Sequence, residues 1–169
     1  IATFKAADGT DVGSSLGMLL NAFVQHFEVH LRDGKIGIPA GARVITQTPL
    51  PDKVEGYYHA VSSVEFAYES MKAFENIYLG KMANGQDGAG IKDYIVYLGT
   101  EYNGGTLDDA IQAQQTVCLN GIMALNDPLQ DEVVNNQQAV MDVFNEMQQL
   151  VVLYKVDLMS ALGILVTYV

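Results

Sequence analysis

The most constraining feature of this sequence is an uninterrupted apolar stripe over residues 136–162. Apolar side chains recur there at alternating steps of four and three, at Val140, Phe144, Met147, Val151, Tyr154 and Leu158. This is the period of one face of an α-helix, and Gly163 suits the position just past a helix end. A helix of about 27 residues is roughly 40 Å long. Because the stripe is broad as well as long, several other helices must pack against it.

Three further stretches have the same period and are bounded by turn residues. The first is predicted over 12–32, with Gly34 as its stop. The second begins at the capping box 62–65 and ends at Gly80. The third begins at the capping residue Thr106 and ends before Asn126, and a short helix is predicted over 91–98. These elements predict an all-α fold with a single domain over 1–169. Its form is an antiparallel four-helix-type bundle with a long connection and a short C-terminal tail.

Composition restricts the classes of function. The chain has 169 residues, of which 49% are apolar and 17% charged, and its net charge is -11. That charge argues against binding to nucleic acid or to an anionic membrane surface. The one cysteine, Cys118, allows no internal disulfide and has the spacing of a core residue. No apolar run is long enough to span a membrane, and a chain that begins with Ile1 rather than Met is expected to be a processed or excised segment.

Motifs for chemistry are weak in this chain. His26 and His30 are four residues apart, as metal ligands on one helix face would be, but no third ligand has a recognisable spacing. His59 follows Gly56 by three residues, without a glutamate three residues after it. The glycine-rich stretch 81–90 lacks the GK(S/T) ending and the preceding strand of a phosphate-binding loop. We therefore predict no metal site and no catalytic residue within this chain alone.

Several motifs, in order along the chain, resemble the imelysin-type family of iron-regulated cell-envelope proteins. The segment GKIGIPAG at 34–41 resembles the family's G-K-x-G-x-P-x-G, and Pro51 to Glu55 followed by two serines resembles a P-x-x-x-E stretch. The tail resembles V-D-x4-L-G-x4-(F/Y), carried here by Val156, Asp157, Leu162, Gly163 and Tyr168.

The resemblance implies that this chain is the second half of a protein with two helical bundles. Such a protein would lie in the cell envelope, periplasmic or lipid-anchored through its N-terminal half, with a role in iron acquisition or in metal or ligand binding between the bundles. Some family members are classed as metallopeptidases, which leaves that activity as an alternative. The implied partner is the N-terminal half, whose G-x-H-x-x-E motif this chain lacks. Iron or another divalent metal is therefore expected only when both halves are present.

The connection at 34–60 is much longer than a link between two helices requires, and long loops are often functional. We predict that residues 34–63 line the cleft toward the other half, with polar contributions from Lys35, Arg43, Glu55 and Ser63. The alternative is that the connection covers the end of the bundle, and that Arg43 and Glu55 are solvated or paired surface charges.

Overall fold

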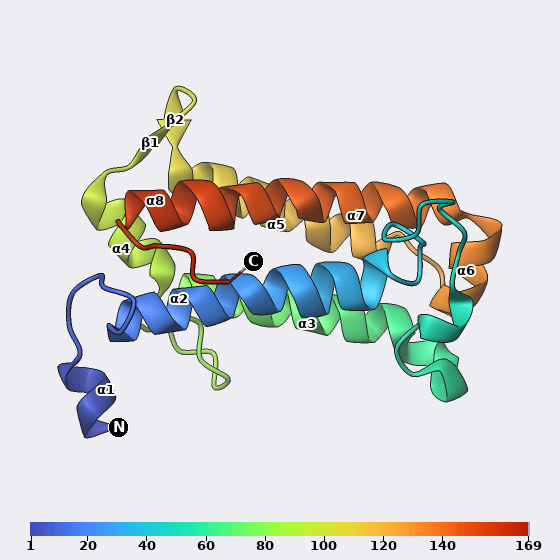
Figure 1. The fold of residues 1–169 in the computed structure, drawn as a ribbon, viewed down its shortest axis with the longest axis horizontal. Helices are drawn as coiled ribbons and strands as arrows, with labels where there is room; N and C mark the ends of the chain where they lie inside the picture. Colours follow the sequence, from blue (N-terminus) through green and yellow to red (C-terminus); the bar gives the residue numbers. More distant parts are fainter. Residues whose placement is uncertain (169) are drawn as a thin grey trace.

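The computed structural model describes residues 1–168, except for the side chains of His59 and Ala60. Four long helical rods lie side by side and antiparallel (Figure 1). The first rod is α2 (Ser15–Gln25) with the π-helical continuation η1 (His26–Gly37), and the second is α3 (Ser63–Leu79). The third is α5 (Leu107–Met123). The fourth joins α7 (Gln137–Val152), π-helical η4 (Leu153–Leu158) and α8 (Met159–Ala161). The predicted all-α bundle is confirmed.

Each rod packs against two others, so that the first contacts the second and fourth, and the third also contacts the second and fourth. The core between them contains the apolar stripe of every rod. In the first rod the buried stripe includes Leu20, Phe23, Phe27 and Leu31, and in the fourth Val140, Val151, Tyr154 and Leu158. Phe144 of the predicted stripe is only half-buried. Gly163 has the positive φ of 65° expected just past the end of the fourth rod.

Short elements close the two ends of the bundle. At one end lie α1 (Ala2–Ala6), α4 (Ile91–Leu98) and a hairpin of β1 (Glu101–Tyr102) and β2 (Gly105–Thr106), in which Glu101 pairs with Thr106. At the other end lie α6 (Leu129–Asn135) and two 3-10 turns, η2 (Pro51–Lys53) and η3 (Tyr57–Ser62). No helix within residues 1–168 has the length and apolar character needed to cross a membrane.

The first rod does not end at Gly34 as predicted, but continues to Gly37. A glycine costs only about 1 kcal/mol inside a helix, and the turns here are π-helical, with Ile38 N–H donating to the Asp33 carbonyl at 2.7 Å. The rod ends just before Pro39. The connection is consequently shorter than the sequence indicated, and its later part contains η2 and η3.

The start of α3 is capped by a distant residue rather than by its own sequence. The Ser62 side chain makes no capping hydrogen bond, so the predicted capping box is wrong. Asp127 Oδ1 instead accepts hydrogen bonds from Val64 N–H at 2.9 Å and from Ser63 Oγ at 3.1 Å. This carboxylate satisfies a free amide at the helix start and ties α3 to the segment before α6. By contrast, the predicted cap of α5 is confirmed, because Thr106 Oγ1 accepts from Asp109 N–H at 3.0 Å.

Candidate functional site

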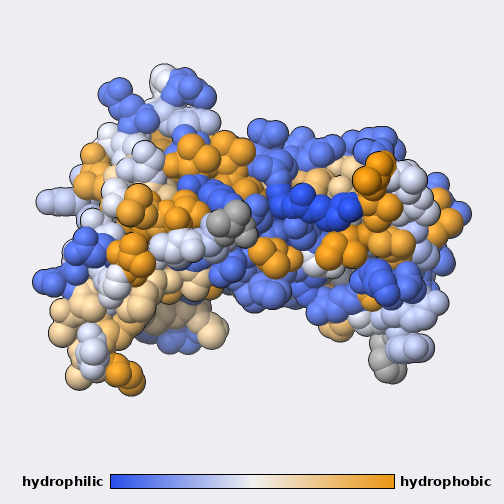
Figure 2. All heavy atoms as spheres, viewed as in Figure 1, coloured by the Kyte–Doolittle hydropathy of each residue, from blue (hydrophilic) through white to orange (hydrophobic). Residues whose placement is uncertain are grey.

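A cluster of charged side chains lies between the first and fourth rods, where both have π-helical turns. We call it the central charge cluster; its members are Glu28, Arg32, Asp33, Arg43 and Lys155. π-Helical turns are rare and often occur at functional sites. Figure 2 shows hydrophilic residues gathered along the middle of the face that these rods form, with hydrophobic residues toward both ends.

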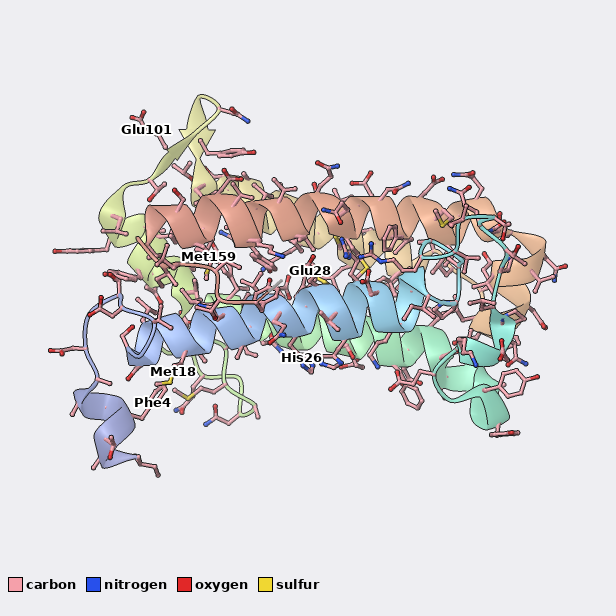
Figure 3. The ribbon with its side chains drawn as sticks, viewed as in Figure 1. Phe4, Met18, His26, Glu28, Glu101 and Met159 are labelled. Atoms are coloured by element: carbon pink, nitrogen blue, oxygen red, sulfur yellow. The ribbon has the colours of Figure 1, made fainter. Side chains whose placement is uncertain are left out.

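Glu28 connects the two rods to the C-terminal tail. Lys155 Nζ donates a hydrogen bond to Glu28 Oε2 at 2.8 Å, and Tyr168 Oη donates to the same oxygen at 3.1 Å. The Lys155 ammonium also lies 4.5 Å from the centre of the Tyr168 ring. Burial alone would raise the pKa of Glu28, but Lys155, Tyr168 and Arg32 together outweigh it and hold that pKa below its ordinary value. Figure 3 shows Glu28 directed toward the fourth rod and His26 on the opposite side.

Arg32 is the most deeply buried cation of the cluster, with 2% of its side chain exposed. Its Nη2 lies 2.9 Å from Asp33 Oδ1 and 3.7 Å from Glu28 Oε1. These carboxylates compensate its charge, yet among the described residues no acceptor is aligned for a hydrogen bond with Nε or Nη2. The guanidinium also lies over the Phe144 ring, 5.1 Å from its centre. Such stacking stabilises a cation held away from water.

Asp33 joins Arg32 to a second arginine from the connection. Arg43 donates to Asp33 Oδ2 from Nε at 3.1 Å and from Nη2 at 2.7 Å, and it lies 5.9 Å from the centre of the Phe144 ring. Phe144 can approach this closely only because Gly37 has no side chain. A Cβ on Gly37 would lie 2.5 Å from the ring. The GKIGIPAG segment and the following Arg43 thus pack against Phe144 of the fourth rod, the segment through Gly37.

After Gly163 the tail turns back and runs beside α2 of the first rod (Figure 1). Asn21, on α2, holds the tail backbone at two points: its Nδ2 donates to the Leu165 carbonyl at 2.9 Å, and its Oδ1 accepts from Thr167 N–H at 2.8 Å. Tyr168 then reaches Glu28. The C-terminal residues singled out in the sequence therefore include one, Tyr168, that contacts the charge cluster.

A separate groove lies between the first rod and α3. It has a volume of about 420 Å³ and a mostly apolar lining, which includes Leu19, Phe23, Phe74 and Ile77, with His26 at its edge. A second pocket of about 430 Å³, lined by Lys35, Glu55 and Glu69, shares Ser70 and Ala73 with it. The two hollows therefore adjoin, and together they make a depression that is apolar at one end and charged at the other.

The structure brings only two of the four predicted cleft residues together. Lys35 and Glu55 form an ion pair at the charged end of this depression. Arg43 belongs to the central charge cluster instead. Ser63 is buried, and its Oγ bonds to Asp127 and to Leu129 N–H, which makes it part of the α3 cap.

Sequence reasoning missed Arg32, Glu28 and Lys155 as a group. The spacing of Glu28 and Arg32, four apart on one helix, was a usable signal for an ion pair. Lys155 lies in the π-helical turns of η4, and its ammonium reaches Glu28 of the first rod. No pattern in the sequence marks those turns.

Among the described residues, no three His, Cys, Asp or Glu side chains come together in a way that could hold a metal ion. His26 and His30 are exposed, with ring centres 4.6 Å apart. Burial, aided by the positive charges of His30 and Lys35, lowers the pKa of His26. The side chain of His59 lies outside the described part of the structure. Cys118 is buried, and burial raises its pKa to about 12, which makes it a poor nucleophile.

Comparison with protein-family models, curated proteins and solved structures gives no significant match to this chain.

Proposed function

We propose that this bundle is the C-terminal half of an imelysin-like cell-envelope protein that binds a metal or small ligand in a cleft between two helical bundles, in the context of iron acquisition. The observation that carries the proposal is the depression between the first rod and α3. It combines an apolar groove, a ligand-sized volume and an ion pair at one end, which is the chemistry typical of binding sites.

The depression is open on its outer side, where Leu19 and Ile77 are 46% and 50% exposed. Exposed apolar side chains that gather beside a groove often mark a surface that binds another domain or protein. An N-terminal bundle placed there would enclose the groove and supply the ligands that this chain lacks. In this proposal the N-terminal half also carries any lipid anchor.

A metallopeptidase is the alternative function. It requires metal ligands and a water-activating carboxylate from the N-terminal half, because the described residues of this chain offer no three-ligand cluster. Binding without catalysis is therefore the function we favour.

The test is to express the whole open reading frame that contains this segment and to compare it with residues 1–169 alone. Equilibration with Fe²⁺ or Zn²⁺, followed by metal analysis, should give stoichiometric metal for the whole protein and none for the isolated bundle. A fluorescent peptide library should remain uncleaved. Metal-dependent cleavage would favour the peptidase instead, and a reading frame without a second helical bundle would overturn the two-bundle proposal.

A further inference from the structure

Two lysines that form no ion pair among the described residues line the same pocket. The chain has nine Lys and Arg residues. Six of them form ion pairs with carboxylates: Arg32, Lys35, Arg43, Lys53, Lys72 and Lys155. Within the described part of the chain, the other three, Lys5, Lys81 and Lys92, have no such pair. Two of these three, Lys81 and Lys92, line the same pocket.

This pocket lies where α3 ends, beside the glycine-rich stretch 81–90, and well away from the central charge cluster. Its volume is about 300 Å³, and its walls come from α3, the glycine-rich stretch, α4 and α5. The lining residues are Leu79, Lys81, Gly85, Asp87, Lys92, Asp93 and Gln112. Most of the lining is polar, in contrast to the groove between the first rod and α3. Such a pocket suits a small, hydrophilic ligand.

The backbone that forms the pocket is held in one conformation. Gly80 has a φ of 77°, and its carbonyl accepts from Gly88 N–H at 2.9 Å. Met82 N–H donates to the Gln86 carbonyl at 2.9 Å. Gly90 packs so closely on this turn that a Cβ there would lie 2.4 Å from Gly80 N. The two glycines therefore fix the relative positions of Lys81 and of α4, which carries Lys92.

The acidic residues of the pocket differ in how far they oppose an anion. Asp93 Oδ2 accepts a hydrogen bond from Gly90 N–H at 2.7 Å, so this carboxylate is engaged in capping α4. Gln112 Nε2 donates to Asp108 Oδ1 at 2.9 Å, so its amide nitrogen is already engaged by a carboxylate outside the lining. Asp87 is the one lining carboxylate with no hydrogen bond or ion pair from its side chain among the described residues. The lining thus contains two lysines and two aspartates, and of the two carboxylates only that of Asp87 is uncommitted.

We propose that this pocket binds a small multivalent oxyanion, a phosphate or a polycarboxylate, between the ammonium groups of Lys81 and Lys92. Each lysine offers up to three N–H donors as a point charge, and hydrogen bonds between ionised groups are the stronger ones. The site does not depend on a nest of glycine amides as a phosphate-binding loop does. The glycines position the lysines, and the lysines bind the ligand. It is also independent of the function proposed for the groove.

The experiment is a titration of residues 1–169 with inorganic phosphate and, separately, with citrate. Chloride keeps the ionic strength constant, and binding is measured by isothermal titration calorimetry and by the chemical shifts of the backbone amides. The expected result is millimolar or tighter binding of at least one of the two, with shifts concentrated at residues 80–93. The Lys81→Gln and Lys92→Gln variants should each weaken binding about tenfold. The Asp87→Asn variant should strengthen it, because a repelling charge is removed.

Lys5→Gln is the matched control, since Lys5 also has no ion-pair partner but lies on α1, and it should bind as the wild type does. Circular dichroism and the thermal midpoint verify that each variant is folded. Preference for phosphate or for citrate identifies which oxyanion the site takes. Absence of binding by both anions at millimolar concentration would overturn the proposal, as would binding that survives loss of both pocket lysines or that Lys5→Gln weakens equally.

Discussion

Glu28 and Lys155 are 127 residues apart in the sequence, yet Lys155 Nζ lies 2.8 Å from Glu28 Oε2. The pair joins the first rod to the fourth at the point where both are π-helical. It also receives Tyr168 from the tail. One carboxylate thus links three segments of the chain.

Removal of this carboxylate should destabilise the bundle. Glu28→Gln leaves Lys155 and Arg32 with less compensating charge in a largely buried position, and the expected loss is about 2 kcal/mol in the free energy of unfolding. Urea denaturation measures it. Asp52→Asn is the control, because Asp52 and its partner Lys53 are both more than half exposed. That exchange should change stability by less than about 0.5 kcal/mol.

The same carboxylate should give the bundle an acid-sensitive step. The pKa of Glu28 in the folded protein lies below its ordinary value of 4.5, so its contribution to stability is present above that value and is lost as the pH falls through the folded-state pKa. Stability measured between pH 7 and pH 3 should therefore fall less steeply in Glu28→Gln than in the wild type. Parallel pH profiles for the two proteins would show that Glu28 does not contribute.

Gly37 should tolerate no side chain. The Gly37→Ala variant places a methyl group against the Phe144 ring, and such overpacking is expected to cost about 1–3 kcal/mol. Gly13→Ala is the control, since a Cβ there meets nothing within 4 Å. A second substitution, Phe144→Leu, should recover part of the loss in Gly37→Ala. If thermal unfolding of Gly37→Ala and Gly13→Ala shifted alike, the close contact would be disproved.

The cap of α3 gives a prediction that distinguishes Ser62, the cap expected from the sequence, from Asp127, the acceptor in the structure. Asp127→Ala should cost about 1–2 kcal/mol, because Val64 N–H loses its acceptor at the helix start. Ser62→Ala should be nearly neutral, since the Ser62 side chain makes no capping bond. Denaturant midpoints compare the two variants. A larger loss of stability in Ser62→Ala than in Asp127→Ala would mean that Ser62 caps α3, as the local sequence indicates.

These cases show why the sequence predicted the bundle more fully than the site. Helix faces follow from a local period, and Leu20, Ile111 and Leu158 are buried as that period indicates. The contacts of Asp127 with α3 and of Lys155 with Glu28 are long-range, and local patterns contain no information about them. The π-helical turns of η1 and η4 are likewise marked by no local pattern. The sequence-based prediction placed four residues of one continuous segment in a single cleft: Lys35, Arg43, Glu55 and Ser63. The segment instead contributes them to three different places in the fold.

The tail should be released by a single substitution in α2. Asn21 is 8% exposed and is the residue whose side chain bonds to the tail backbone at both Leu165 and Thr167. Asn21→Ala removes both bonds, and Asn21→Asp removes the donor to the Leu165 carbonyl while it keeps an acceptor for Thr167 N–H. Hydrogen exchange of the Thr167 amide should therefore be fast in Asn21→Ala and intermediate in Asn21→Asp. The amides of Val140 to Leu158 in the fourth rod should retain their protection in both variants, because the apolar stripe of that rod stays buried against the other rods. Release of the tail should also withdraw Tyr168 from Glu28 and bring the pKa of Tyr168, which burial and Glu28 now raise, back toward its ordinary value, measurable by ultraviolet titration. Unchanged exchange at Thr167 in Asn21→Ala would mean that Tyr168 and the apolar contacts of Ile164 hold the tail without Asn21.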